Sequence, residues 1–203
     1  MFRNVKELER FVESTPPFPR PRLRLEQYPT DAALVALAVW DASLRGFLKK
    51  VLDLGCGTGR FALAAAAMGA DFVVCVDVDV DALGVALRAS RERGLYNVEF
   101  LAADVEQLRL RGRFDVVFQN PPFGIWSGRG TDMAFLQTAL RHADVVYTIH
   151  KLSTFDYVRS TVKRWGFQLD VLETATLNLK PVYKHHKKKV YKVKVFLALV
   201  RKS

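Results

Sequence analysis

The sequence has few cysteines and no long apolar run. Cys56 and Cys75 are its only two cysteines, which argues against a disulfide framework or a four-ligand zinc site. Both lie in segments typical of a core strand or a tight turn, so we expect small buried residues. No apolar run reaches the roughly 18 residues of a membrane span, and the first residues lack the hydrophobic stretch of a signal peptide. These absences predict a soluble protein of a reducing, cytoplasmic compartment.

Acidic residues are scarce relative to basic ones. The chain has 31 Lys and Arg against 21 Asp and Glu, a formal net charge of +10. The last 30 residues contain nine Lys or Arg and no acidic residue. This excess favours a polyanionic partner, because basic side chains that neutralise phosphates release condensed counterions. An ordinary soluble protein with a generous basic surface has the same balance, so charge alone does not identify the function.

Strand-like and helical segments alternate from Val51 onward. This alternation predicts a parallel sheet covered by helices on both faces. Two β-rich runs without a helix between them follow, and they predict an antiparallel hairpin at one edge of the sheet. The expected strands are 51–54, 72–78, 98–101, 114–119, 144–149, 167–179 and 190–200, and the expected helices are 59–68, 80–93, 132–142 and 153–165.

The first 48 residues are organised differently. Residues 3–13 have a helical pattern, and the prolines between 16 and 21 then predict an extended arm over 14–24. A second helix is expected to run to about Leu48, with Thr30 as its N-cap. No internal repeat or second domain is evident.

A glycine-rich turn, Asp53-Leu54-Gly55-Cys56-Gly57-Thr58-Gly59, joins the first buried strand to the next helix. Glycines there permit positive φ and let a ligand lie close to the backbone at the helix N-terminus. Dinucleotide-binding folds use a similar turn, and a tight turn without a ligand has the same composition. The turn alone therefore indicates a cofactor site without naming the cofactor.

Acidic residues follow the next two strands. Asp77 lies 22 residues beyond Gly55, where a carboxylate can accept hydrogen bonds from ribose hydroxyls. Asp104 and Val105 follow the third strand and would place a carboxylate and an apolar side chain beside an adenine. Asp79 is better explained as a cap of the following helix.

The spacing D-x-G-x-G-x-G differs from the G-x-G-x-x-G of nicotinamide dehydrogenases. It resembles motif I of the class I methyltransferases, whose cofactor is S-adenosyl-L-methionine. This resemblance implies backbone contact with the cofactor from Gly55 to Arg60 and places Asp53 near the methionine end of the cofactor.

Asn120-Pro121-Pro122-Phe123 follows the fourth strand, at the edge of the sheet where open α/β folds bind ligands. An adenine amino nitrogen is a poor nucleophile because its lone pair is delocalised into the ring. The Asn120 side-chain oxygen and the Pro121 carbonyl can each accept one N–H, which favours a more tetrahedral nitrogen, and the rigid prolines hold that carbonyl in place. Phe123 can stack on a base. Two prolines that merely end a strand are the simpler alternative.

The tetrapeptide leaves the acceptor open. The same motif serves guanine-N2 enzymes, and a relative that ends in Tyr serves glutamine methylation, so Phe123 favours a base without separating adenine from guanine. DNA adenine and RNA guanine-N2 methyltransferases therefore remain alternatives to an adenine-N6 enzyme of ribosomal RNA. An RNA-binding protein with a vestigial cofactor fold is the non-enzyme alternative, and the intact motifs disfavour it.

Further stretches at 25–30, 130–136 and 183–189, together with 120–124, resemble the methyltransferase-like protein five family over roughly residues 20–200. The resemblance implies a Rossmann-like class I methyltransferase fold, with a mostly parallel seven-stranded sheet, a C-terminal antiparallel hairpin and helices on both faces. It implies methylation of adenine N6 in small-subunit ribosomal RNA, with S-adenosylhomocysteine as the other product. We expect one domain over 1–203, with N-terminal helices and an arm at 1–48 and the catalytic core at 49–203.

The resemblance also implies site residues and partners, with no metal among them. Cofactor contacts are expected at Gln27, Thr30, Asp53, Gly55, Thr58, Arg60, Asp77, Asp104 and Val105, and catalysis at Asn120, Pro121, Pro122 and Phe123. The basic residues near both ends, independently of the resemblance, predict RNA contacts at Lys184, His186, Lys187, Lys188 and Lys189, in a phosphate-binding track with Arg20, Arg22 and Arg24 beside Phe123 and Trp126. The candidate partners are ribosomal RNA or the small ribosomal subunit, and a small zinc-binding activator that pairs with eukaryotic members at a sheet edge.

Overall fold

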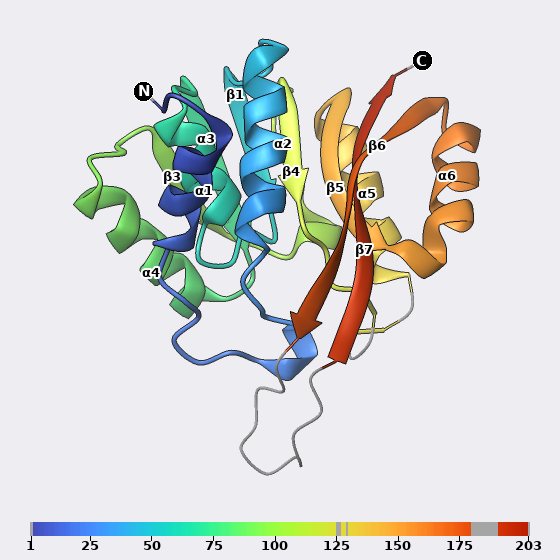
Figure 1. Ribbon diagram of the computed structural model, residues 1–203, viewed down its shortest axis with the longest axis horizontal. Coiled ribbons are helices and arrows are strands. Elements are labelled where there is room, and N and C mark those ends of the chain that lie inside the picture. Colours follow the sequence, from blue (N-terminus) through green and yellow to red (C-terminus); the bar gives the residue numbers. More distant parts are fainter. Residues whose placement is uncertain (1, 125–126, 129, 180–190, 203) are drawn as a thin grey trace.

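The computed structural model describes residues 2–124, 127–128, 130–179 and 191–202. Seven strands form one sheet in the order β3-β2-β1-β4-β5-β7-β6 (Figure 1). This arrangement confirms the mostly parallel sheet with a C-terminal antiparallel hairpin. The strands are β1 (Lys50–Leu54), β2 (Phe72–Asp77), β3 (Val98–Ala102), β4 (Val116–Gln119), β5 (Val145–Lys151), β6 (Phe167–Leu179) and β7 (Tyr191–Lys202).

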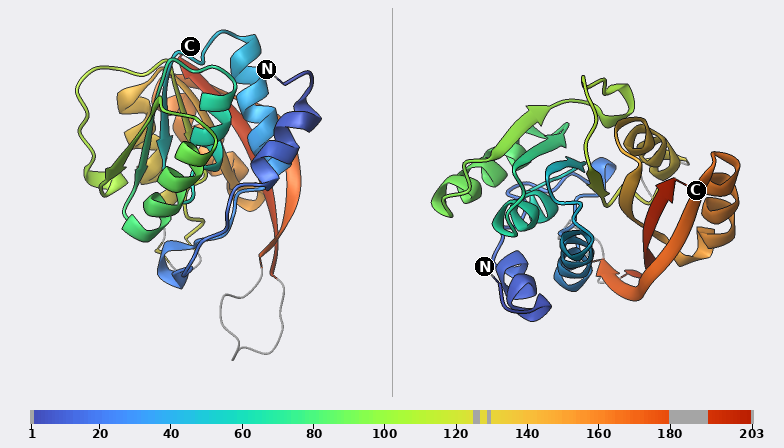
Figure 2. Two further views of the ribbon diagram at one scale, coloured as in Figure 1. Left: turned by 90° about the vertical axis from the view of Figure 1, so that its left-hand side faces the viewer. Right: turned by 90° about the horizontal axis from the view of Figure 1, so that it is seen from above.

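Helices cover both faces of the sheet, as Figure 2 shows from two directions. One buried cluster joins α1, α2, α3 and part of α4 to one face, and a second joins α5 and α6 to the other. Among the described residues, no helix has the length and apolar character that a membrane crossing needs. The helices are α1 (Val5–Glu13), α2 (Ala32–Leu44), α3 (Arg60–Ala67), α4 (Val80–Glu92), α5 (Thr131–His142) and α6 (Phe155–Arg164), with short 3-10 turns η1 (Leu23–Leu25), η2 (Val105–Gln107) and η3 (Leu152–Thr154).

Helix α2 begins and ends differently from the sequence prediction. The side chain of Asp31, rather than that of Thr30, caps the helix by accepting hydrogen bonds from the backbone N–H groups of Ala33 and Leu34. A capping oxygen satisfies N–H groups that have no partner within the helix. The Thr30 hydroxyl is therefore available for another contact, described below.

The order in which strands are added to the sheet reverses at β1. Strand β1 pairs in parallel with β2 on one side and with β4 on the other. Leu54 lies opposite Gln119 in this register. The two segments that follow these strands, the glycine turn and the Asn120-Pro121-Pro122-Phe123 motif, consequently leave the sheet next to each other. Open α/β sheets bind their ligands at such a switch point.

The C-terminal hairpin lies with β7 inside the sheet and β6 at its edge. Strand β7 pairs antiparallel with both β5 and β6. Val195 to Val200 are buried, as expected for a continuous apolar run on an interior strand. The edge strand β6 instead exposes many of its side chains, which matches its more polar sequence.

Candidate active site

A cavity of about 300 Å³ opens where β1, β2, β3 and β4 end. This volume is at the lower end of the range for small-molecule sites, roughly 300–1,000 Å³. It is lined by residues 24–30 before α2, the glycine turn, the residues at the ends of β2 and β3, and Asn120 and Pro122, together with Phe18 of the arm and residues of α5. Figure 1 shows η1 and the segment that follows it beneath this end of the sheet. Of the expected site residues, Gln27, Thr30, Gly55, Thr58, Arg60, Asp77, Asp104, Val105, Asn120 and Pro122 line the cavity.

The glycine turn has a backbone that other residues adopt at a cost. Gly55, Gly57 and Gly59 have φ values of 66°, 54° and 85°. A Cβ atom on Gly57 would lie 2.5 Å from the ring of Phe18, and one on Gly55 would lie 2.9 Å from the ring of Phe135. Both the left-handed backbone and the close approach of neighbouring rings therefore require glycine.

Asp77 holds the glycine turn against the end of β2. One carboxylate oxygen accepts a hydrogen bond from the Gly57 N–H and the other from the Asp79 N–H, each at 2.8 Å. Burial raises the pKa of this carboxyl, and the backbone donors oppose the shift. The side chain lines the cavity and keeps lone pairs that are not used by these two donors. Its expected contact with ribose hydroxyls stays a prediction.

Asp53 lies behind the turn. It is 1% exposed, and one of its oxygens accepts a hydrogen bond from the Ala62 N–H at 2.9 Å. Burial raises its pKa to about 8, while the bond from Ala62 lowers it and the charge of Asp77 raises it further. Asp53 is not among the residues that line the cavity, so its contact with the cofactor remains a prediction.

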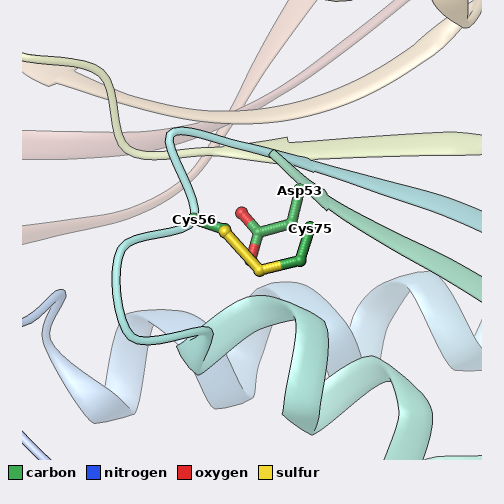
Figure 3. Close-up of side chains that lie close together, drawn as sticks. All are labelled: Asp53, Cys56 and Cys75. Atoms are coloured by element: carbon green, nitrogen blue, oxygen red, sulfur yellow. A yellow bond between two sulfur atoms is a disulfide. The ribbon is translucent and has the colours of Figure 1, made fainter. Parts of the chain in front are cut away.

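The two cysteines are buried, as expected, but they form a disulfide, which the small number of cysteines had argued against. Figure 3 shows the bond between Cys56 in the glycine turn and Cys75 on β2, with the Asp53 carboxylate beside it. Their Cα atoms lie 5.6 Å apart because β1 and β2 are parallel neighbours and Asp53 stands opposite Cys75. This pairing depends on a contact between strands that a separation of 19 residues does not reveal.

The arm makes ion pairs at the start of α4. Asp79 caps this helix, as predicted, by accepting from the Asp81 N–H. Arg22 pairs with both of these acids, and Arg20 pairs with Asp81 at 3.0 Å. Gln27 donates to Asp79 at 2.7 Å and lines the cavity. The guanidinium groups of Arg20 and Arg22 therefore face acids in this structure, and their expected contact with phosphate stays a prediction.

Arg24 is the remaining basic residue of the expected track that the structure describes. Arg24 is exposed at the cavity. Trp126 and the predicted RNA contacts Lys184, His186, Lys187, Lys188 and Lys189 lie outside the described residues.

The Asn120 amide is oriented by the segment before α2. Its Nδ2 donates to the Thr30 hydroxyl oxygen at 3.1 Å. Its Oδ1 is buried and has no hydrogen-bond partner within the part of the chain that the structure describes. The Arg60 guanidinium donates to the Thr30 carbonyl, so α3 supports the same segment. The Asn120 side-chain oxygen is thus an acceptor held in one orientation at the cavity.

Phe123 is buried, and its expected stacking on a base stays a prediction. It is 3% exposed, and its ring stacks on that of Tyr28 with centroids 5.6 Å apart. Tyr28 lines the cavity and Phe123 does not. The face offered toward the cavity by this aromatic pair is therefore that of Tyr28. Burial and the nearby Glu26 charge raise the pKa of Tyr28, which keeps it neutral.

Several lining residues were not singled out by the sequence pattern. Phe18 and Phe135 flank the glycine turn, and Glu26 and Tyr28 come from the segment before α2. Phe18, Glu26 and Tyr28 lie in irregular segments that have no helical or strand periodicity. Phe135 lies on α5, where the periodicity does not distinguish a cavity-lining ring from a core residue. The signal for Glu26 and Tyr28 was the block 25–30, in which only Gln27 and Thr30 were assigned contacts.

Comparison with known proteins agrees with this geometry. The methyltransferase domain family matches residues 48–189. The rRNA N(6)-adenosine-methyltransferase METTL5 of Danio rerio is 34% identical over 199 residues, which cover 94% of this chain and 95% of the relative. The crystal structure of PH1948 from Pyrococcus horikoshii is 30% identical, has a TM-score of 0.88, and the match covers 100% of this chain and 99% of that one.

A more distant structure shows the same fold. Magnesium protoporphyrin IX methyltransferase of Synechocystis, solved with bound SAM, is 18% identical with a TM-score of 0.63, over 100% of this chain and 86% of that chain. The sheet order, the glycine turn and the cavity at the switch point define a class I methyltransferase. Within that class, the chain belongs to the METTL5 family of methyltransferases.

Proposed function

We propose that this protein transfers the methyl group of S-adenosyl-L-methionine to the exocyclic N6 of adenine in small-subunit ribosomal RNA, in the cytoplasm. The observation that carries the proposal is the oriented Asn120 amide, whose buried Oδ1 faces no protein donor among the described residues. A buried acceptor without a donor costs free energy, so a site that retains one is prepared for a donor from outside. The amino group of a base is such a donor.

The residues around the cavity fit the proposed cofactor. A turn built from three glycines with positive φ presents its backbone at the N-terminus of α3. Asp77 and Asp104 supply carboxylates, and the side chain of Val105 is apolar. When bound, the cofactor supplies an electrophilic methyl group on a sulfonium, and S-adenosylhomocysteine is the other product.

The chain's own part in the reaction is to bind and orient the acceptor. Asn120 Oδ1 accepts one amino N–H and the Pro121 carbonyl accepts the other, which directs the nitrogen lone pair away from the protein acceptors. Thr30 prevents rotation of the Asn120 amide, and this preorganisation lowers the reorganisation needed at the moment of transfer. No titrating base is required, because the methylated amino group loses its proton readily to water.

The family relation also supports the proposed partners. A small zinc-binding activator would add to a free edge of the sheet, and β3 is one of its two edges. Tyr96, just before β3, is 68% exposed, and Phe72 on the neighbouring strand is 40% exposed. The basic residues of the last 30 positions favour ribosomal RNA as the substrate.

The substrate assignment is tested by offering three matched substrates to the protein, with and without an activator of this kind. We expect methyl transfer to small-subunit RNA and N6-methyladenosine as the product after nucleoside digestion, with little transfer to large-subunit RNA or DNA. N2-methylguanosine, or a preference for DNA or the large subunit, would contradict the substrate assignment. Absence of transfer to all three, with binding of S-adenosyl-L-methionine also undetectable by calorimetry, would favour a vestigial RNA-binding protein.

A Thr30→Val variant tests the orientation of the amide. Valine has nearly the shape of threonine and removes only the hydroxyl that accepts from Asn120 Nδ2. The loss of a hydrogen bond of this kind, about 1 kcal/mol, predicts a kcat lower by about fivefold. Because Thr30 also lines the cavity, its cofactor Kd is measured separately. Thr176→Val, at an exposed position on β6, is the matched control. Equal kcat values in the two variants would refute this role.

A further inference from the structure

Glu26 has an unusual backbone and an unusual location for a carboxylate. It follows η1 with φ 50° and ψ 42°, in the left-handed region, and no other non-glycine residue among those described has positive φ. Its N–H donates to the Leu23 carbonyl at 2.9 Å, and the residue is 6% exposed. A left-handed non-glycine residue costs about 1 kcal/mol or more. The surrounding contacts must therefore favour this conformation.

The carboxylate of Glu26 bridges the catalytic loop. One oxygen accepts from the Phe123 N–H at 2.7 Å, and the other accepts from the Ser127 N–H at 3.1 Å and from the Ser127 hydroxyl at 2.9 Å. These partners lie 97 and 101 residues away in the sequence. Bonds from backbone N–H groups to a buried carboxylate are shorter and stronger than bonds between neutral groups.

We propose that Glu26 is the positioning residue of the catalytic loop: its carboxylate fixes the backbone after Pro122 so that the acceptor groups of the motif meet the base in the reactive geometry. This inference rests on the proposed function. Glu26 does not touch the reacting atoms in this role. It acts through the Phe123 amide, which follows directly on the two prolines.

The same short segment holds the motif at two points. Thr30 orients the Asn120 side chain, and Glu26, four residues earlier, holds the main chain on the other side of the prolines. Between them, Gln27 bonds to Asp79 at the cofactor end of the cavity, and Tyr28 stacks on Phe123. Residues 26–30 thus connect the cofactor side of the cavity to the base side. A displacement of about 1 Å in such a loop can cost a hundredfold in rate.

The test is Glu26→Gln, which keeps the volume of the side chain. The carboxamide retains one acceptor oxygen. Its NH₂ group takes the place of the other oxygen and so faces a backbone N–H that donates to the carboxylate in the wild-type protein. We expect kcat, with the RNA that the wild-type protein methylates, to fall about ten- to hundredfold. The Kd for S-adenosyl-L-methionine should stay within about threefold, because the glycine turn and Asp77 are unchanged.

Asp115→Asn provides a matched control. Asp115 also accepts a backbone N–H with one oxygen, from Lys50 at 2.8 Å, at the opposite end of the sheet. Its substitution makes the same chemical change away from the cavity, so kcat should be unchanged. A Glu26→Gln variant whose kcat equals that of Asp115→Asn overturns the proposal. So does a proportional loss of cofactor affinity and unfolding temperature, because that pattern indicates a purely structural residue.

Ser127→Ala supplies a second, milder change. It removes the hydroxyl donor and leaves both backbone donors, so we expect a loss in kcat of about threefold. Combined with Glu26→Gln, it should add almost nothing, because both act through one cluster of hydrogen bonds. Fully additive losses would contradict the proposal.

Hydrogen exchange separates failure of this inference from failure of the proposed function. In Glu26→Gln we expect at least a tenfold faster exchange in a peptide that covers 121–128, with a peptide over 53–62 unchanged. This measurement needs no methyl transfer. If the wild-type protein methylates none of the tested nucleic acids, the proposed function fails, while the exchange result still decides whether Glu26 holds the loop. Unchanged exchange at 121–128 overturns the role of Glu26.

Discussion

Asn120→Ala is expected to lower kcat for methyl transfer by about a hundred- to a thousandfold or to abolish it, the size of effect seen when one preorganised polar group is removed from an active site. Alanine removes the buried Oδ1 that is available to the amino group and the Nδ2 that Thr30 holds. Cofactor affinity should remain nearly intact, because the turn and Asp77 do not depend on the amide. Methyl transfer from radiolabelled donor and calorimetric cofactor binding provide the two measurements.

Two further variants make this expectation sharper. Asn120→Asp keeps an acceptor oxygen, and the Thr30 hydroxyl can donate to it, so we expect activity between that of the alanine variant and that of the wild type. Asn178→Ala removes an exposed amide from β6 and should leave kcat unchanged. An Asn120→Ala variant with wild-type turnover would remove the residue from the mechanism.

Asp77→Asn is expected to raise the Kd for S-adenosyl-L-methionine by about ten- to a hundredfold, the equivalent of 1.5–3 kcal/mol for hydrogen bonds to a charged group. The carboxylate accepts from both Gly57 and Asp79, and an amide has only one oxygen for these two donors. The glycine turn should therefore lose its alignment and the ribose hydroxyls an acceptor. Asp71→Asn, at an exposed position just before β2, is the matched control.

The pH dependence of cofactor affinity gives the same residue a second readout. Burial raises the pKa of Asp77, so protonation begins at a higher pH than for an ordinary aspartate. The ionised carboxylate is the better acceptor, and affinity should fall as the pH is lowered through this raised pKa. The Asp77→Asn profile should be flatter in that range. A Kd that is the same for both proteins at every pH would show that Asp77 does not hold the cofactor.

The fold was largely predictable because its signals are local. Alternating apolar strands and amphipathic helices have their own periodicities, and the predicted elements agree with the observed ones to within a few residues. The hairpin at the end was predicted from two β-rich runs without a helix between them. The boundaries moved where a side-chain contact decided them, as at α2, whose cap is Asp31.

The candidate site was predictable as a set of motifs and not as a set of contacts. Glycine at 55, 57 and 59 follows from the positive φ of the turn, which is a local property. The burial of Phe123 depends on Tyr28, and the ion pairs of the arm depend on the acids of α4. These partners are at least 57 residues apart in the sequence, so no local pattern predicts that they meet.

The sequence by itself determined the alternating fold, the cofactor turn and the position of Asn120-Pro121-Pro122-Phe123 after a strand, because each depends on residues close together in the chain. The tertiary structure alone decided which groups meet: Cys56 with Cys75, Thr30 with Asn120, and Glu26 with Phe123. Parallel pairing of β1 with β2 and β4 brings these distant segments to one edge. Contacts across that edge, and not the motifs alone, give the Asn120 amide its orientation.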